Sequence, residues 1–413
     1  MNKISLILVP ILFLGVSCIP EKESTSIEPA LGMWHVSLNS EDRPSLPFTA
    51  ELKRVDGKYN FVIHNANENI IVKDINHSGK ALQMSMPVFE SVFEGKLIDS
   101  ARWEGMWRDP SRGDDYSIPF VAVQGKRARF GTYSSEIKLD TMYEVAFSQG
   151  TNDEYPAIGY FYQNGAKVSG TFRTETGDYR FLEGGLNGNK MELSAFDGSH
   201  AFLFDAEVKK DGTLEGTFYS GNHWKEPWVG KPNTEVKLTD PEQLTYLKEG
   251  YTGIEFSFPD KNGKMITYPT DSMFQGKAVI IQILGSWCPN CMDETSLFAR
   301  WYKQYHGEGL EIIGLAFERQ KLPERAFAAI DKMKKSLDVD YPIVLASNTT
   351  NKKTASEKLP MLSRVISYPT SIFIDKGGNI RTIHTGFNGP ATGRLYDEFV
   401  NTNEQLIRQM LAE

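Results

Sequence analysis

Two cysteines separated by two residues are the part of this sequence best suited to chemistry. Cys288 and Cys291 enclose Pro289 and Asn290, and the one other cysteine of the chain is Cys18, near the N-terminus. Paired thiols at this spacing exchange disulfides or bind a metal, and a structural metal site of this kind usually needs a second pair. Because the chain has no second pair, the sequence predicts a redox-active disulfide that needs no metal and no other cofactor.

The segments around the cysteines indicate a buried strand followed by a helix. Residues 277–284 form a β-branched apolar run suited to a central strand, and residues 292–306 have a helical pattern. The attacking species in disulfide exchange is a thiolate, which must be reachable and is favoured where a helix begins with unpaired N–H groups. We therefore assign the attack to Cys288, with Pro289 at the first helical position and Cys291 as the less exposed resolving thiol.

The chain from residue 252 onward alternates strands with helices, which predicts a thioredoxin-like α/β domain over residues 252–413 with a central mixed sheet flanked by helices. A polar linker, residues 239–251, precedes it. The expected strands, after a hairpin within residues 255–268 and the central run at 277–284, are 310–317, 342–346, 370–375 and 380–385. The expected helices are 323–337, a weaker one near 354–366, and 395–411.

The motifs of this region resemble the TlpA/ResA family of membrane-tethered bacterial thiol-disulfide oxidoreductases. The resemblance rests on Trp287 before the cysteine pair, Glu294 after it, and Tyr368-Pro369-Thr370 before a strand. It implies a thioredoxin fold over about residues 252–413 and exchange of protein disulfides through the cysteine pair. It favours reduction as the direction, with electrons supplied by a membrane thiol donor.

The resemblance also implies a proton shuttle. Glu294 follows Cys291 by three residues on the same helical face, and in the family the acid at this position takes the proton of the resolving cysteine. The alternative is a solvated glutamate that pairs with a base such as Arg300, while Asp293 points to a different face. Ordinary thioredoxins carry a buried acid at the strand position that is Gln282 here, so proton transfer depends more heavily on Glu294.

Substrate contacts are expected at the loop before the last strands. The family's loop predicts that the Tyr368–Pro369 bond is cis and faces the cysteines, where the extended residue before the proline can pair with a substrate backbone. The alternative is a trans proline that starts an edge strand. Trp287 and Pro289 complete the expected substrate side, and Trp287 either shields the cysteines or fills the core.

The first residues predict export. Lys3 precedes an apolar run, residues 4–16, which is shorter than the roughly 20 residues that span a bilayer. The run ends in a stretch that resembles a lipobox, although its leucine, Leu14, stands one position early. We expect a signal peptide at 1–17, a tether at 18–31 and a lipid anchor on Cys18, which places the protein in the cell envelope, outside the cytoplasm. An ordinary signal peptide with an incidental cysteine is the alternative.

Residues 32–238 are expected to form an all-β domain of unknown role, a barrel or a sandwich. Residues 79–85 resemble 188–194, which indicates two related meanders. Aromatic residues here either fill the core or line a ligand pocket. A glycine-x-aromatic pattern recurs four times, as Gly32-Met33-Trp34, Gly105-Met106-Trp107, Gly170-Thr171-Phe172 and Gly216-Thr217-Phe218.

Composition limits the function classes. The formal charge of −8 and the absence of basic runs argue against nucleic-acid partners. The leading hypothesis is an exported, membrane-tethered thiol-disulfide oxidoreductase. One alternative is a thioredoxin-fold peroxidase of the AhpC/TSA antioxidant type, whose usual Pro-x-x-x-Thr-x-x-Cys setting is absent. The other is a ligand- or metal-binding module that uses the β-rich half and the cysteine pair.

Overall fold

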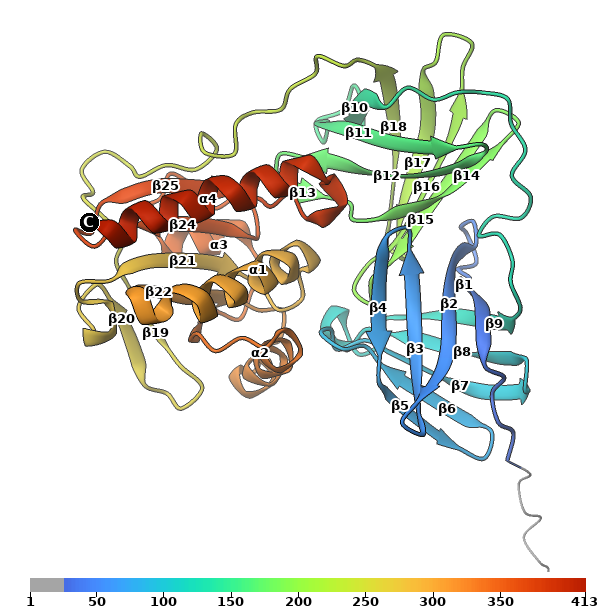
Figure 1. Ribbon diagram of the computed structural model, residues 1–413, viewed down its shortest axis with the longest axis horizontal. Helices are drawn as coiled ribbons and strands as arrows, with labels where there is room; N and C mark the ends of the chain where they lie inside the picture. The colour runs from blue at the N-terminus through green and yellow to red at the C-terminus, as the bar shows by residue number, and fades with distance from the viewer. Residues whose placement is uncertain (1–25) are drawn as a thin grey trace, which may run out of the picture.

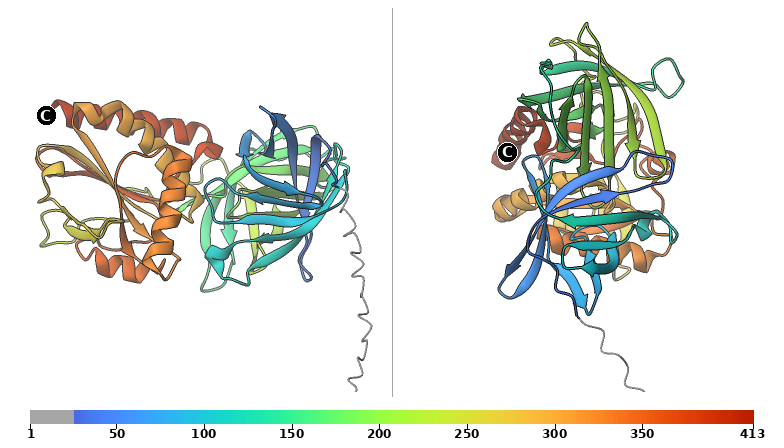
Figure 2. Two further views of the ribbon diagram at one scale, coloured as in Figure 1. Left: turned by 90° about the horizontal axis from the view of Figure 1, so that it is seen from below. Right: turned by 90° about the vertical axis from the view of Figure 1, so that its right-hand side faces the viewer.

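The computed structural model describes residues 26–413, so the predicted signal peptide and Cys18 lie outside the described residues. Figure 1 shows two β-sheets, both built from the first half of the chain, on one side and an α/β domain on the other. The left-hand view in Figure 2 shows the same division. Within residues 26–413, no helix combines the length and the apolar character needed to cross a membrane.

The first sheet contains nine antiparallel strands in the order β4-β3-β2-β1-β9-β8-β7-β6-β5. Burial alternates along β1, as expected for a strand with one face toward a core. The strands are β1 (Gly32–Leu38), β2 (Leu46–Val55), β3 (Lys58–Asn65), β4 (Glu68–Val72), β5 (Asp74–Ser78), β6 (Ala81–Ser85), β7 (Val92–Asp99), β8 (Arg102–Arg108) and β9 (Ser117–Gln124).

The second sheet also has nine antiparallel strands, in the order β11-β10-β18-β17-β16-β15-β14-β12-β13, and a further β11–β12 pairing closes it into a ring. A closed ring leaves few unpaired edges. The strands are β10 (Met142–Phe147), β11 (Tyr155–Asn164), β12 (Lys167–Thr174), β13 (Gly177–Asp178), β14 (Leu182–Asn187), β15 (Lys190–Phe196), β16 (Ala201–Val208), β17 (Leu214–Ser220) and β18 (Trp224–Pro232).

The predicted β-rich first half is confirmed, and the choice left open between one barrel and two sheets falls to two sheets. The internal similarity has a structural counterpart, because β6 and β8 flank β7 in the first sheet as β15 and β17 flank β16 in the second. The sheets touch where Phe196 stacks on Phe48, with ring centroids 4.6 Å apart. Asn65 bonds to both the N–H and the C=O of Phe196 at 3.2 and 2.9 Å.

Three of the four recurring glycines mark close approaches between strands. A Cβ atom on Gly105, Gly170 or Gly216 would overlap a carbonyl oxygen of the neighbouring strand. The aromatic residue two positions after each glycine is buried. Most tryptophans of residues 32–238 fill cores in the same way, since Trp34, Trp103, Trp107 and Trp228 are buried and Trp224 is exposed.

Replacing Gly216 by alanine tests this explanation. The added methyl group would overlap the oxygen of Asp205 on β16, so we expect a loss of about 1–3 kcal/mol in the free energy of unfolding, the usual cost of overpacking. Urea unfolding measures the change. Gly253→Ala is the matched control because a Cβ there meets no atom within 4 Å, and equal losses in the two variants would contradict the explanation.

The C-terminal domain is built on a five-stranded mixed sheet in the order β23-β22-β21-β24-β25. The strands β21, β22 and β23 run parallel, β24 pairs antiparallel with β21, and β25 pairs antiparallel with β24. The elements are β19 (Phe256–Pro259), β20 (Met265–Tyr268), β21 (Ala278–Leu284), α1 (Pro289–Tyr305), β22 (Leu310–Phe317), α2 (Pro323–Leu337), β23 (Ile343–Ser347), α3 (Lys352–Lys358), β24 (Thr370–Ile374), β25 (Ile380–Thr385) and α4 (Arg394–Ala412).

The structure corrects the expected helix near residues 354–366. The helix that forms, α3, ends at Lys358. Pro360 explains the early end, because a proline lacks the N–H that a helix needs and disfavours helical geometry in the residue before it.

Two segments that were expected to be loose are packed. Part of the predicted tether lies against the first sheet, where the N–H groups of Ile27 and Ala30 bond to the carbonyls of Gly79 and Ser100 at 3.0 and 2.7 Å. Within the predicted linker 239–251, Leu244 and Thr245 are buried, and Leu247 forms a bridge with Leu362 of the C-terminal domain. Apolar side chains within these polar stretches explain the packing.

Candidate functional site

The strand β21 and the helix α1 position the two cysteines. Every residue of β21 is buried between β22 and β24, so the strand's end is fixed in the middle of the sheet. Cys288 is the N-cap of α1, and Pro289 is its first residue. The backbone N–H of Cys291 donates to the sulfur of Cys288 at 3.3 Å. This contact and the helix dipole both favour negative charge on the Cys288 sulfur.

The proline loop faces the cysteines. The Tyr368–Pro369 peptide is cis, as predicted. The thiol of Cys288 donates to the carbonyl of Tyr368 at 3.3 Å, which places this backbone beside the sulfur.

Trp287 lies between the proline loop and the C-terminal end of β22. Its indole N–H donates to the carbonyl of Phe317 at 2.9 Å, and its ring meets the Tyr368 ring edge to face with centroids 5.7 Å apart. The guanidinium of Arg319 lies 4.4 Å above the indole. Trp287 is half-buried, so it both packs against the core and stands beside Cys288.

Glu294 is fully buried behind the cysteines. One carboxylate oxygen accepts a bond of 2.8 Å from the amide of Gln282, and the other, Oε1, has no hydrogen-bond partner among residues 26–413. Burial raises the pKa of Glu294 to about 8, while the amide of Gln282 and the hydroxyl of Ser371 hold it lower than burial alone would. The alternative pairing with Arg300 does not occur, since Arg300 bonds to Tyr396.

Burial also raises the pKa of Cys291, and the charge of Glu294 raises it further. A thiol of this kind needs a base before it can attack. A carboxylate with a pKa near 8 and a free oxygen is suited to accept the proton at mildly alkaline pH, where its ionised form is populated.

Gln282 makes more contacts than the sequence predicted. The sequence indicated only that it replaces the buried acid of ordinary thioredoxins, but its side chain is the centre of a buried hydrogen-bond network. The amide N–H₂ donates to Glu294, and the carbonyl oxygen accepts from Thr295 at 3.2 Å and from Tyr341 at 3.0 Å. This network orients the carboxylate of Glu294, so Gln282 is a positioning residue.

Glu318 was not identified from the sequence. It accepts bonds from the N–H and the hydroxyl of Ser286 at 2.9 and 2.7 Å, and so fixes the turn that leads into the cysteines. Burial raises the pKa of Glu318 to about 7. Its position supplied a usable signal, because an acid directly after a buried strand lies at the same sheet edge as the end of a parallel neighbour.

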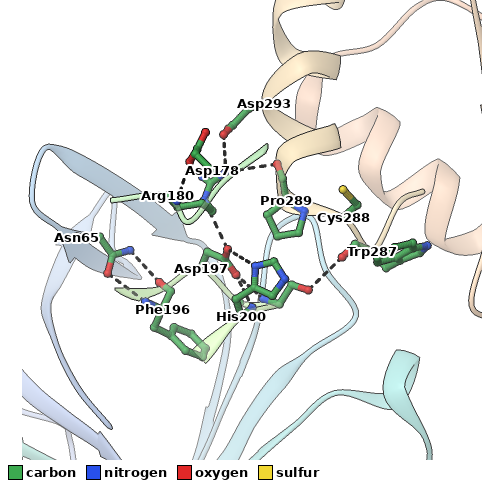
Figure 3. A network of polar contacts seen from close by, with 12 residues as sticks. Asn65, Asp178, Arg180, Phe196, Asp197, His200, Trp287, Cys288, Pro289 and Asp293 are labelled. Atoms are coloured by element: carbon green, nitrogen blue, oxygen red, sulfur yellow. Dashed lines mark hydrogen bonds and ion pairs between the residues drawn. The ribbon is translucent and has the colours of Figure 1, made fainter. Parts of the chain in front are cut away.

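The exposure predicted for Cys288 is wrong in this structure. Both cysteines are buried, Cys288 at 7% exposure and Cys291 at 0%. The cause is the β-rich half, which lies over the site (Figure 3): Ser199 donates to the carbonyl of Trp287 at 3.0 Å, and Arg180 donates to that of Pro289 at 3.3 Å. Such long-range contacts leave no local pattern in the sequence.

A small cavity of about 220 Å³ remains beside Cys288. Larger hollows lie elsewhere, and one of about 1110 Å³ is bordered by residues 127–133 and is lined by no cysteine. We place the site at Cys288 because the reactive groups converge there. In the part of the chain that the structure describes, no group of three or more histidine, cysteine or acidic side chains is arranged to hold a metal ion.

Comparisons with known proteins agree with this geometry. The sequence profile of the AhpC/TSA family matches residues 250–383. The thiol-disulfide oxidoreductase ResA of Bacillus subtilis is 28% identical over 140 residues, which are 34% of this chain and 69% of that protein. The thioredoxin-like protein YneN of the same organism is 25% identical over 161 residues, 38% of this chain and 84% of YneN.

Among solved structures, a thiol:disulfide interchange protein of the thioredoxin family from Chlorobium tepidum aligns with 39% of this chain and 95% of its own. The TM-score is 0.30 and the sequence identity is 20%.

The fold and the sequence relatives together define the class of the C-terminal domain, which is that of the thioredoxin-fold thiol-disulfide oxidoreductases. Within this class, the domain is similar to the ResA proteins of Bacillus subtilis and Bacillus thuringiensis, at 28% and 29% identity. The family profile ends at residue 383 and begins at residue 250, and the alignments with ResA and YneN span 34% and 38% of the chain.

Proposed function

We propose that this protein reduces disulfides outside the cytoplasm through Cys288 and Cys291, with Glu294 as the proton acceptor. One observation carries the proposal. A thiol at the N-terminus of α1 lies beside the Tyr368 carbonyl, and a buried carboxylate with a raised pKa lies behind the second thiol. This is the set of groups that two-step disulfide exchange requires.

The first step is attack by the Cys288 thiolate on a substrate disulfide. The substrate S–S bond breaks, a mixed disulfide forms with Cys288, and the leaving thiolate takes a proton from solvent. Trp287, Pro289 and the Tyr368–Pro369 loop surround the attacking sulfur and orient the substrate there.

The second step releases the reduced substrate. Cys291 gives its proton to Glu294 and attacks the sulfur of Cys288, which forms the Cys288–Cys291 disulfide and expels the second substrate thiol. Two electrons pass from the protein to the substrate. A thiol donor must then reduce the protein disulfide, and a membrane thiol protein is the donor that we propose.

The proposed setting is the cell envelope. A lipid on Cys18 would tether the chain after removal of residues 1–17, and the electrons would come from the same membrane. Disulfides that occur in that compartment are the proposed substrates. Comparing the membrane association of the full chain with that of Cys18→Ser tests the anchor, since equal association would contradict it.

The reaction is tested by mixing the pre-reduced protein with insulin, with cystine and with hydrogen peroxide, and by titrating copper in parallel. We expect stoichiometric loss of the protein thiols with a disulfide substrate and release of substrate thiols. Peroxide consumption or metal binding without any disulfide reduction would replace the proposal with the peroxidase or binding-module alternative. The reduction potential of the cysteine pair tests the direction, because a potential more oxidising than roughly −180 mV would indicate an oxidase.

A further inference from the structure

The β-rich half contributes residues to the site of the cysteines. Its segment from Thr174 to Phe202, which we name the wall, borders the 220 Å³ cavity opposite Trp287 and Cys288. The wall side of the cavity consists of Thr174, Thr176, Gly177, Asp178, Tyr179, His200 and Phe202.

A buried arginine fastens the wall to α1. The side chain of Arg180 is 3% exposed, and its guanidinium bonds to Asp293 of α1 at 2.5 Å (Figure 3). The same guanidinium pairs with Glu68 and Asp197, both of the β-rich half. Arg180 is therefore held in place by its own half and reaches across to the helix that carries the cysteines.

Backbone contacts bring the wall close to the active-site motif. The side-chain amide of Asn290 fits between the N–H and the C=O of Asp178, at 3.1 and 3.3 Å when its oxygen faces the N–H. The carboxylate of Asp178 accepts from the N–H of Gly389 at 2.5 Å. Ser367, two residues before Pro369, donates to the carbonyl of Thr176 at 2.8 Å. The wall thus occupies the space where an extended substrate segment would approach the proline loop.

Further contacts hold the first sheet against the same domain. The ammonium of Lys332 on α2 donates to the carbonyl of Phe89 at 2.5 Å, and Arg319 donates to the hydroxyl of Ser111 at 3.3 Å. Gln320 and Ser336 also bond across this boundary, to Glu90 and to the carbonyl of Pro87. With both sheets bonded to the domain, the wall is a docked part of the site.

We propose that the docked wall determines the substrate class, and that it admits to Cys288 only disulfides whose attacked half is about the size of an amino acid. This inference rests on the proposed function. The cavity volume of about 220 Å³ is below the range of roughly 300–1,000 Å³ that holds drug-sized ligands. A disulfide on the surface of a folded protein cannot enter it, so protein disulfides react only when the wall moves away.

The lining fits a small polar disulfide. Tyr179 and Phe202 supply aromatic surface, and Thr174 and Thr176 supply polar groups. Burial lowers the pKa of His200, so its imidazole adds a neutral polar group at pH 7 and not a fixed charge. Cystine has the required size and the polar ends that such a pocket accepts.

Thiol reagents of graded size test whether the wall restricts access. In the full chain with Cys18→Ser and Cys291→Ser, Cys288 is the one remaining thiol. We expect iodoacetamide to alkylate Cys288. A maleimide attached to a polyethylene glycol of roughly 5 kDa is far larger than the cavity, and we expect it to react with Cys288 at least ~100-fold more slowly than it reacts with a free cysteine peptide. An equal rate with the peptide would overturn the inference.

Asp293→Ala tests whether Arg180 holds the wall. Arg180 keeps Glu68, Asp197 and the Pro289 carbonyl, so the change removes the ion pair across the interface without leaving a buried charge alone. We expect the large reagent to react about 10-fold faster, equivalent to ~1.4 kcal/mol, with the iodoacetamide rate unchanged. Glu398→Ala, which removes an exposed acid of α4 paired with Arg394, is the control. No change in Asp293→Ala would refute the fastening role.

Substrate rates complete the test. With both cysteines present, the unaltered chain is expected to reduce cystine at least ~10-fold faster than insulin, and Asp293→Ala to raise the insulin rate alone. Equal rates for the two substrates in the unaltered chain would overturn the substrate class. Reduction of neither cystine nor insulin would contradict the proposed function itself, and this outcome differs from equal rates for the two substrates.

Discussion

Cys288→Ser is expected to abolish disulfide reduction, whereas Cys291→Ser is expected to stop the reaction halfway. A serine hydroxyl does not supply the thiolate that attacks a disulfide, so the rate with Cys288→Ser should fall on the order of 10³-fold or more. In Cys291→Ser the attack still occurs, but no thiol resolves the product. A mixed disulfide between Cys288 and the substrate should therefore accumulate.

Intact-protein mass spectrometry after mixing with cystine separates the two variants. Cys291→Ser should gain the mass of one cysteine bound through a disulfide, and Cys288→Ser should not. Serine is a favourable N-cap residue and can accept the N–H of residue 291, so we expect Cys288→Ser to keep α1 and its circular dichroism spectrum. The opposite pattern, with the adduct on Cys291, would reverse the two roles.

The C-terminal domain was predictable because its signals are local. A buried apolar run, a cysteine pair and a helix follow one another within residues 278–305, and this order places Cys288 at a helix N-terminus from sequence alone. Cys291 and Glu294 share a helical face by their spacing. Cys291 was therefore expected to be less exposed than Cys288, with Glu294 near it, and the structure buries both.

The covering of Cys288 was not predictable in this way. Arg180 meets Asp293 across 113 residues of sequence, and Ser199 meets Trp287 across 88. No periodicity or motif in the sequence predicts either contact. The residues around Arg180 form a β-rich stretch whose pattern does not indicate Asp293 as its partner. Pairing of distant segments is decided by tertiary packing, which binary patterns of single elements do not encode.

Gln282 and Glu318 were partly predictable from the sequence. Each is a polar residue in or directly after a buried apolar run, so the sequence itself shows an exception to the apolar pattern at these two positions. Buried polar groups need hydrogen-bond partners, which predicts that such residues organise a network. The partners themselves could not be read from the sequence, because Glu294 reaches Gln282 through the packing of α1 on the sheet and Ser286 reaches Glu318 through the register of β21 beside β22.

Glu294→Gln is expected to slow the resolving step by about 10²-fold at pH 8, the lower end of what a positioned base contributes. The carboxylate form of Glu294 becomes more populated as pH rises toward its pKa of about 8, so release of the second substrate thiol should accelerate over that range in the unaltered protein. Glutamine accepts no proton. The variant should lose this part of the profile and depend on the buried Cys291 thiol alone.

Stability gives a second, independent readout of the same group. The pKa of Glu294 is raised from 4.5 on folding, so the folded state retains a proton that the unfolded state releases between about pH 4.5 and pH 8. The folded state therefore binds more protons in this window, and the stability of the unaltered protein relative to Glu294→Gln should fall as pH rises through it. Urea unfolding at pH 5 and pH 8.5 measures the difference.

Single-turnover release from a preformed mixed disulfide isolates the resolving step from the attack. Glu398→Gln, on the exposed face of α4, controls for the loss of one carboxylate elsewhere. If Glu294→Gln shifted the stability profile but left the pH dependence of release unchanged, Glu294 would titrate in the core without serving as the proton acceptor. The proton of Cys291 would then have to leave by another route, and Oε1 of Glu294 would be an unpaired buried oxygen without a catalytic reason.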